Sequence, residues 1–186
     1  MIFFGIFILF GSIALILAVR GNWFALGSDE AKKVIPQFYN QSLEVSLGSR
    51  KLTVTPLAGN PVKVVQKDVR YIYEEAYKNT DVVQTNYPYR IKEELIFSAP
   101  GHPLEFRYKL GNVDKFIVEK DDKGNIIFYD KQQYARDKEL SRVFTILTPF
   151  IEDKNRRSFE DVKGVVDGDL LTITINPEWM KKPLIL

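Results

Sequence analysis

The strongest constraint on the fold is an alternation of apolar and polar residues that recurs along residues 43–175. The clearest case is Leu170–Ile175, where apolar residues alternate with threonine directly after the turn Asp167-Gly168-Asp169. Successive side chains of a strand point to opposite faces, so such a run buries one face and exposes the other. An Asp-Gly pair between two alternating runs is a strong hairpin signal. The pattern therefore predicts antiparallel strands.

About ten segments of this kind follow one another, with turn residues at short spacing between them. They cover residues 43–47, 52–54, 62–66, 69–73, 89–97, 104–110, 116–119, 126–129, 142–147, 161–166 and 170–175. Many short strands with frequent turns are typical of sandwiches and barrels rather than of alternating β and α elements. We predict an all-β fold, an antiparallel β-sandwich-like domain preceded by one hydrophobic N-terminal helix.

The helix is predicted from an uncharged run that begins at Ile2 and ends at Val19, in which Ser12 is the one strongly polar residue. A helix of this length rises about 27 Å, close to the hydrocarbon thickness of a bilayer. Arg20, Asn22 and Trp23 follow, as expected where a helix reaches the membrane interface. The run predicts a membrane anchor or a signal segment. Its length favours an uncleaved anchor, although Ala25-Leu26-Gly27 also fits a cleavage site.

We therefore divide the chain into an anchor or signal segment at residues 1–27, a linker or short helix at 28–42, and a β-rich soluble domain at 43–186. The charges are balanced and interspersed, with 26 basic and 24 acidic residues and a net charge of +2. This balance argues against a nucleic-acid partner, which selects a strongly basic face. The chain has no cysteine, which excludes disulfides and thiolate chemistry.

The candidate chemical groups are few. His102, the sole histidine, lies in a Gly-His-Pro turn, and a structural role is favoured over a catalytic or metal-binding one. Carboxylates pair in sequence at Glu74-Glu75, Glu93-Glu94, Asp121-Asp122 and at Asp167 with Asp169. Neighbours on a strand face opposite ways, so Glu93 and Glu94 do not form a glycosidase pair by themselves. The stretch from Asp121 to Asn125 lacks the spacing of a calcium loop and predicts a hairpin turn.

Tyrosines are frequent in the predicted strands. Those that could line a sugar-binding face are Tyr71, Tyr73, Tyr87, Tyr89 and Tyr108. Aromatic residues favour strands and pack across them, so a place in the core or on a sheet face is the preferred interpretation. No catalytic, cofactor-binding or metal-binding residue is assigned from the sequence, and no cofactor is expected.

Four motifs occur in an order that resembles a known group of proteins. They are VRYIY (residues 69–73) followed by Thr80-Asp81-Val82, IKEELIF (91–97) leading into LEFRYKL (104–110), DKGNIIFYD (122–130), and LLTITI (170–175) followed by Pro177-Glu178-Trp179-Met180. Over residues 62–183 this resembles the β-rich region near the N-terminus of large bacterial wall-associated, YD-repeat (RHS-like) and DNRLRE-domain surface proteins. In that family a further strand follows the tryptophan. Lys182 to Leu186 would begin it, so the chain resembles a fragment of a longer member.

The resemblance implies a cell-surface or secreted location, with the β-domain extracytoplasmic, and a non-catalytic structural or adhesive role. The positive-inside rule gives the opposite signal, because Arg20, Lys32 and Lys33 follow the apolar run and favour a cytoplasmic C-terminal side. Two alternatives stay open: a single-span accessory subunit of a membrane protein complex, and a carbohydrate-binding module. The expected partners are the membrane, through Ile2 to Val19, and proteins or surface glycans.

Overall fold

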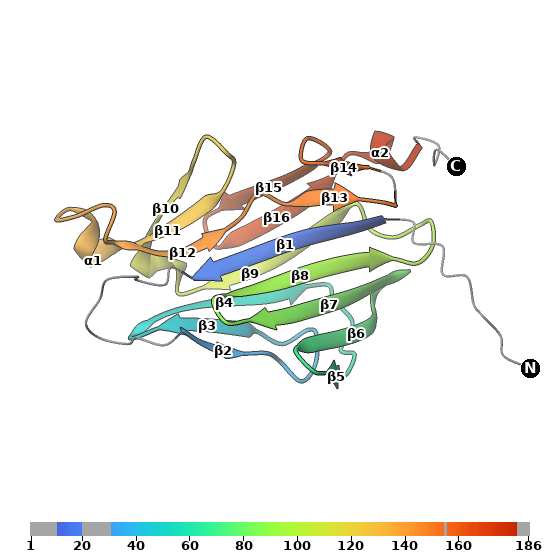
Figure 1. Cartoon of the computed structure of the whole chain (residues 1–186), viewed down its shortest axis with the longest axis horizontal. Coiled ribbons are helices and arrows are strands. Elements are labelled where there is room, and N and C mark those ends of the chain that lie inside the picture. The colour runs from blue at the N-terminus through green and yellow to red at the C-terminus, as the bar shows by residue number, and fades with distance from the viewer. Residues whose placement is uncertain (1–10, 20–30, 155, 182–186) are drawn as a thin grey trace, which may run out of the picture.

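A computed structural model describes residues 11–19, 31–154 and 156–181 of the chain. In this part the chain forms two antiparallel sheets, which confirms the all-β prediction (Figure 1). The ten-stranded sheet has the order β10 (Phe116–Lys120), β11 (Ile126–Asp130), β12 (Arg142–Ile146), β1 (Gly11–Val19), β8 (Arg90–Phe97), β7 (Thr80–Tyr87), β6 (Arg70–Tyr77) and β5 (Val65–Lys67). Off this path, β13 (Phe150–Glu152) pairs with β1 and with β14 (Arg157–Ser158).

The six-stranded sheet has the order β15 (Val162–Asp167), β16 (Leu170–Ile175), β9 (Glu105–Gly111), β4 (Arg50–Leu57), β3 (Leu43–Leu47) and β2 (Ala31–Val34). Helical segments in the described residues are short: η1 (Val113–Lys115), α1 (Lys131–Tyr134) and α2 (Pro177–Lys181). No helix among them has the length and apolar character of a membrane span.

The core lies between the inner faces of the two sheets. In β9, Phe106, Tyr108 and Leu110 are buried while the residues between them are exposed, as the alternation predicts. Phe106 packs against Tyr77 and Phe97 of the other sheet, with ring centroids 5.0 and 6.2 Å apart. Burial of apolar side chains contributes about 1.5–3 kcal/mol for each large residue, so this interface is the main source of stability.

The predicted hairpins form where turn residues supply the unusual backbone angles. Gly168 joins β15 to β16 with φ 58°, a conformation that glycine adopts at little cost. In the turn between β10 and β11, the Asp121 carboxylate accepts hydrogen bonds from the backbone N–H groups of Lys123 and Asn125. This confirms the hairpin predicted at Asp121 to Asn125.

The N-terminal helix predicted from Ile2 to Val19 is described only from Gly11 onward. For Gly11–Val19 the structure has strand β1, which lies between β8 and the strands β12 and β13 (Figure 1). Residues 1–10 and 20–30 lie outside the described residues, and so does most of the predicted 1–27 segment. A long apolar run fits a buried strand as well as a helix, because it has no period that separates the two.

Residues 28–42 also differ from the predicted linker or short helix. Strand β2 begins at Ala31 and pairs with β3 along the edge of the six-stranded sheet. Further on, Tyr39 is fully buried and belongs to the core. The β-rich body therefore begins before residue 43.

Candidate functional site

The most unusual group in the core is a carboxylate on the inner face of β8. The residues of this face are Ile91, Glu93, Leu95 and Phe97, which are buried, whereas their neighbours Lys92, Glu94 and Ile96 are only half-buried. Glu93 therefore takes a position that the alternation assigns to an apolar side chain. A buried carboxylate is costly unless other groups donate hydrogen bonds to it.

Two donors reach Glu93, one from each sheet. Gln84 lies directly opposite Glu93 on β7, and its Nε2 donates to Glu93 Oε2 over 2.6 Å. Tyr108, on β9 of the other sheet, donates its phenolic O–H to Glu93 Oε1 over 2.9 Å. The carboxylate thus ties the two sheets together at their inner faces.

Three further tyrosines surround this bridge. The Tyr39 hydroxyl donates to the Tyr77 hydroxyl over 3.3 Å, and the Tyr39 ring lies 5.3 Å from the Tyr73 ring. The Tyr73 hydroxyl donates to the carbonyl of Pro36 over 2.6 Å. Each of these phenols is therefore both packed against a ring and satisfied by a polar partner, as buried tyrosines require.

The electrostatics follow from burial. Desolvation raises the pKa of Glu93, and the hydrogen bonds from Gln84 and Tyr108 oppose that rise without cancelling it. Desolvation and the nearby charge of Glu93 raise the pKa of Tyr108 well above its ordinary value. Desolvation also raises the pKa of Tyr73 and of Tyr77. The phenols therefore stay protonated donors, and Glu93 holds its proton to a higher pH than an exposed glutamate.

Chemically, the arrangement is suited to holding the sheets together. Hydrolysis of a glycosidic bond needs two carboxyls that flank a substrate, and the hydrogen-bond partners of Glu93 are an amide and a phenol. Within the described ranges, no cluster of three or more His, Asp or Glu side chains could hold a metal ion. In the same part of the chain, the side-chain oxygens Gln84 Oε1 and Asn86 Oδ1 are buried without a hydrogen-bond partner.

The other residues that were considered as candidates from the sequence lie at different places in the fold. His102 is buried, and its ring stacks on Phe97 with centroids 3.9 Å apart, so it extends the aromatic core. Glu94 lies on the opposite face from Glu93 and pairs with Lys92 over 2.7 Å. This confirms that Glu93 and Glu94 do not act as a pair.

The remaining carboxylates lie in turns or irregular strand positions. Glu74 and Glu75 are exposed at a register shift between β6 and β7, where Glu75 has φ 54°. Asp169 lies 3.8 Å from Lys109 in an exposed ion pair on the outside of the six-stranded sheet. Exposed pairs of this kind contribute little to stability.

The five strand tyrosines do not share one exposed face. Tyr73 and Tyr108 are buried in the core, and Tyr71 is half-buried against it. Tyr87 and Tyr89 are exposed at the turn between β7 and β8, where the Arg90 guanidinium lies 4.6 Å from the Tyr87 ring. Their exposed area is therefore confined to this hairpin end.

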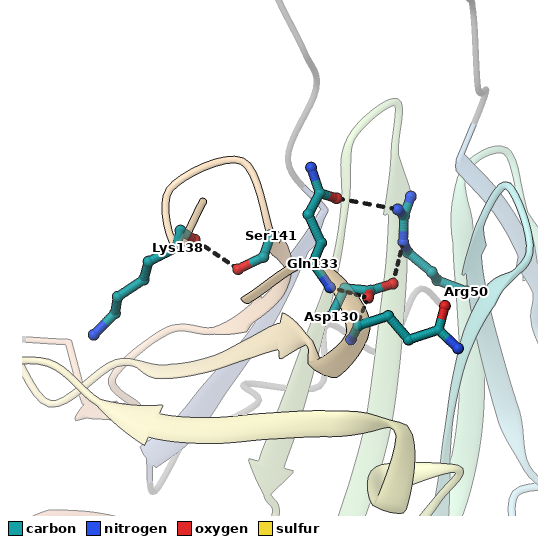
Figure 2. Close-up of polar contacts among 6 residues, drawn as sticks. Arg50, Asp130, Gln133, Lys138 and Ser141 are labelled. Carbon is teal, nitrogen blue, oxygen red and sulfur yellow. Dashed lines mark hydrogen bonds and ion pairs between the residues drawn. The ribbon is translucent and has the colours of Figure 1, made fainter. Parts of the chain in front are cut away.

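A second polar cluster, which the sequence did not reveal, joins the two sheets at one end of the molecule. Arg50, at the start of β4, donates from Nε to Asp130 Oδ2 over 2.6 Å and from Nη2 to Gln133 Oε1 over 3.4 Å (Figure 2). Asp130 also caps α1, because its Oδ1 accepts the backbone N–H groups of Gln132 and Gln133. Nearby, Ser141 donates to the carbonyl of Lys138.

The pKa of Asp130 reflects this double role. Desolvation raises it, but the hydrogen bonds from Arg50 and from the N–H groups of α1 outweigh that effect, so the pKa is lowered overall. An Asp before a short polar segment is a weak cap signal in the sequence, and nothing in the sequence pairs it with Arg50 eighty positions earlier. This cluster positions α1 and has the chemistry of a structural contact.

Comparison with known proteins assigns no family or role to these residues. Protein-family models, curated proteins and solved structures were all compared with the chain, and none of them matches. The resemblance to the β-rich region of bacterial surface proteins therefore stays a prediction that depends on four short motifs. The function must be inferred from the fold and from these two polar clusters.

Proposed function

We propose that this chain is a non-catalytic β-domain with a structural or adhesive role at the cell surface, and that in its anchored form the run from Ile2 to Val19 leaves the sheet and forms a membrane helix. The observation that carries the proposal is that the side chains best suited to chemistry are buried and bonded within the core. Glu93, Tyr108 and His102 are each buried and contact neighbouring side chains or backbone groups. Their role is therefore to stabilise the folded domain.

Three other features support the same function. The uncharged N-terminal run has the length of a span. The order of the sequence motifs resembles surface proteins. The balanced charge favours neither nucleic acid nor a strongly charged partner.

The surface placement can be tested by cysteine labelling, because the natural chain has no cysteine. Val165 is 54% exposed on the edge strand β15, and Val82 is fully buried on β7. We expect Val165→Cys to react with a membrane-impermeant maleimide on intact cells, and Val82→Cys to react only after denaturation. Labelling of Val165→Cys that requires cell lysis would contradict a surface location.

An accessory subunit of a membrane complex is the second candidate. It is favoured by Arg20, Lys32 and Lys33 after the apolar run. Lys33, however, donates hydrogen bonds to the backbone carbonyls of Tyr87 and Pro88. Its ammonium group therefore also has a role within the β-domain. Purification in mild detergent separates the candidates: a partner that stays bound at a fixed stoichiometry supports the subunit, and a lone chain supports the self-contained domain.

A further inference from the structure

Strand β1 fills a slot in the middle of the ten-stranded sheet. On one side its backbone pairs with β8, in register from Gly11 opposite Phe97 to Ala18 opposite Arg90. On the other side it pairs with β12 and β13, in both cases antiparallel. Figure 1 shows β1 in blue between these strands. Without β1, the strands β5 to β8 and the strands β10 to β14 would be separate parts of the sheet.

The same residues form the second half of the proposed membrane helix. A helix needs about 20 apolar residues to cross the hydrocarbon core. The helix of the proposed function runs from Ile2 to Val19 and therefore contains all of Gly11–Val19, which the structure places in the sheet. Strand and membrane helix are therefore two mutually exclusive states of one segment.

When the segment lies in the membrane, the slot loses its strand. The backbone N–H and C=O groups that pair with β1 on β8, β12 and β13 then have no partner, and such edges bind extended chains readily. Neighbouring strands are about 4.8 Å apart, so a slot left by one strand has the width for one other. Its natural occupant, GSIALILAV, carries no charge and no proline.

We propose that in the membrane-anchored form this slot binds an extended, uncharged peptide strand that a partner protein supplies, antiparallel to β8 and about eight residues long. The inference rests on the anchor of the proposed function and adds a binding site and the chemistry of its partner. Main-chain hydrogen bonds on both sides give the affinity, and the apolar composition of the strand gives the selectivity.

The register of the slot allows a test with paired cysteines in the full chain. Ala18, Arg90 and Tyr87 lie in one row across β1, β8 and β7. In protein without lipid, we expect a disulfide in Ala18→Cys/Arg90→Cys. In the matched control Ala18→Cys/Tyr87→Cys, the disulfide yield should be on the order of ten-fold lower, because β8 lies between the two positions and keeps them about 9.6 Å apart. Failure of the first pair to cross-link would overturn the assignment of the slot.

The second arm uses the single variants Arg90→Cys and Tyr87→Cys of the full chain, reconstituted into phosphatidylcholine vesicles and recovered by flotation. The probe is a synthetic peptide of residues 11–19 with cysteine at the place of Ala18 and a lysine tail for solubility. We expect a mixed disulfide with Arg90→Cys and, from the same spacing, on the order of ten-fold less with Tyr87→Cys.

The outcomes separate this inference from the proposed function. Chains that float with vesicles but form no register-specific adduct would overturn the slot and leave the anchor in place. In the opposite case, the chains do not float and the Ala18→Cys/Arg90→Cys disulfide forms fully with vesicles present. The segment Gly11–Val19 would then stay in the sheet as strand β1. That result would overturn the inference and the anchor together.

Discussion

Tyr108 and Glu93 meet across the interface between the two sheets, where the phenolic O–H of Tyr108 donates to Glu93 Oε1 over 2.9 Å. Glu93 is the one charged residue on the inner face of β8, and its second oxygen accepts from Gln84 on the neighbouring strand. A carboxylate that links three strands in the core makes the stability of this domain dependent on pH.

Replacing Glu93 with glutamine should raise the stability at neutral pH and flatten its pH dependence. Because burial raises the pKa of Glu93, the folded state binds this proton more tightly than the unfolded state. The contribution of Glu93 is therefore fully present below the ordinary glutamate pKa and is lost as pH rises through the raised value. We expect Glu93→Gln to gain about 1–3 kcal/mol at neutral pH, since the amide avoids burial of a charge.

Urea unfolding of both proteins between pH 4 and pH 8, a window chosen about the ordinary glutamate pKa, measures this difference. Glu94→Gln is the matched control, because Glu94 lies on the opposite, half-buried face and pairs with Lys92. A Glu93→Gln protein with the same pH profile as the natural chain would disprove the role of Glu93.

Replacing Tyr108 with phenylalanine should lower the stability by about 1–3 kcal/mol, because the buried carboxylate of Glu93 loses one of its hydrogen-bond donors. It should also raise the pKa of Glu93 further, so that the loss of stability with pH moves to higher pH. Tyr73→Phe is the control: Tyr73 donates to a backbone carbonyl and does not bond Glu93. Equal pH profiles for the two variants would count against the Tyr108–Glu93 link.

Replacing Asp130 with alanine should cost about 1–2 kcal/mol, because α1 loses its cap and Arg50 loses its ion pair. The pKa of Asp130 is lowered in the folded state, so its contribution is present above the ordinary aspartate pKa and is lost as pH falls through the lowered value. Lys51→Ala, which breaks the exposed pair with Glu44, should change stability by less than about 0.5 kcal/mol. Thermal unfolding at pH 7 and pH 3 would compare them, and a similar loss for both variants would contradict this prediction.

Replacing Trp179 with alanine should cost about 3–5 kcal/mol, because Trp179 is 3% exposed and belongs to the core although it lies in the short helix α2. The Arg156 guanidinium lies 3.9 Å from its ring and adds a cation–π contact. Phe159, which is 54% exposed, provides the control for loss of a large aromatic side chain. Comparable urea midpoints for Trp179→Ala and Phe159→Ala would show that α2 lies outside the cooperative unit.

Strands whose inner face is apolar and whose outer face is polar could be predicted from the sequence. This is why β9 and β16 were found with the correct faces. β7 lacks this contrast, because Thr80, Gln84 and Thr85 are buried among its valines. Its alternation is hidden, and the sequence predicted no strand there.

The site residues were harder to predict than the strands. Glu93 interrupts an otherwise apolar inner face in IKEELIF, and that interruption is the one local signal of a buried carboxylate. Its donors come from β7 and β9, and which strand lies opposite which is decided by the sheet order rather than by local pattern. The pair of Arg50 and Asp130 depends on the same long-range order.

The position of β1 also sets a sequence of events during synthesis. Gly11–Val19 leaves the ribosome before its strand partners, which lie at residues 90–97, 142–146 and 150–152. At about 5–20 residues per second, many seconds pass before those partners are made. Throughout that delay the segment is a free apolar peptide, so a targeting receptor or a bilayer can capture it before the competing sheet exists.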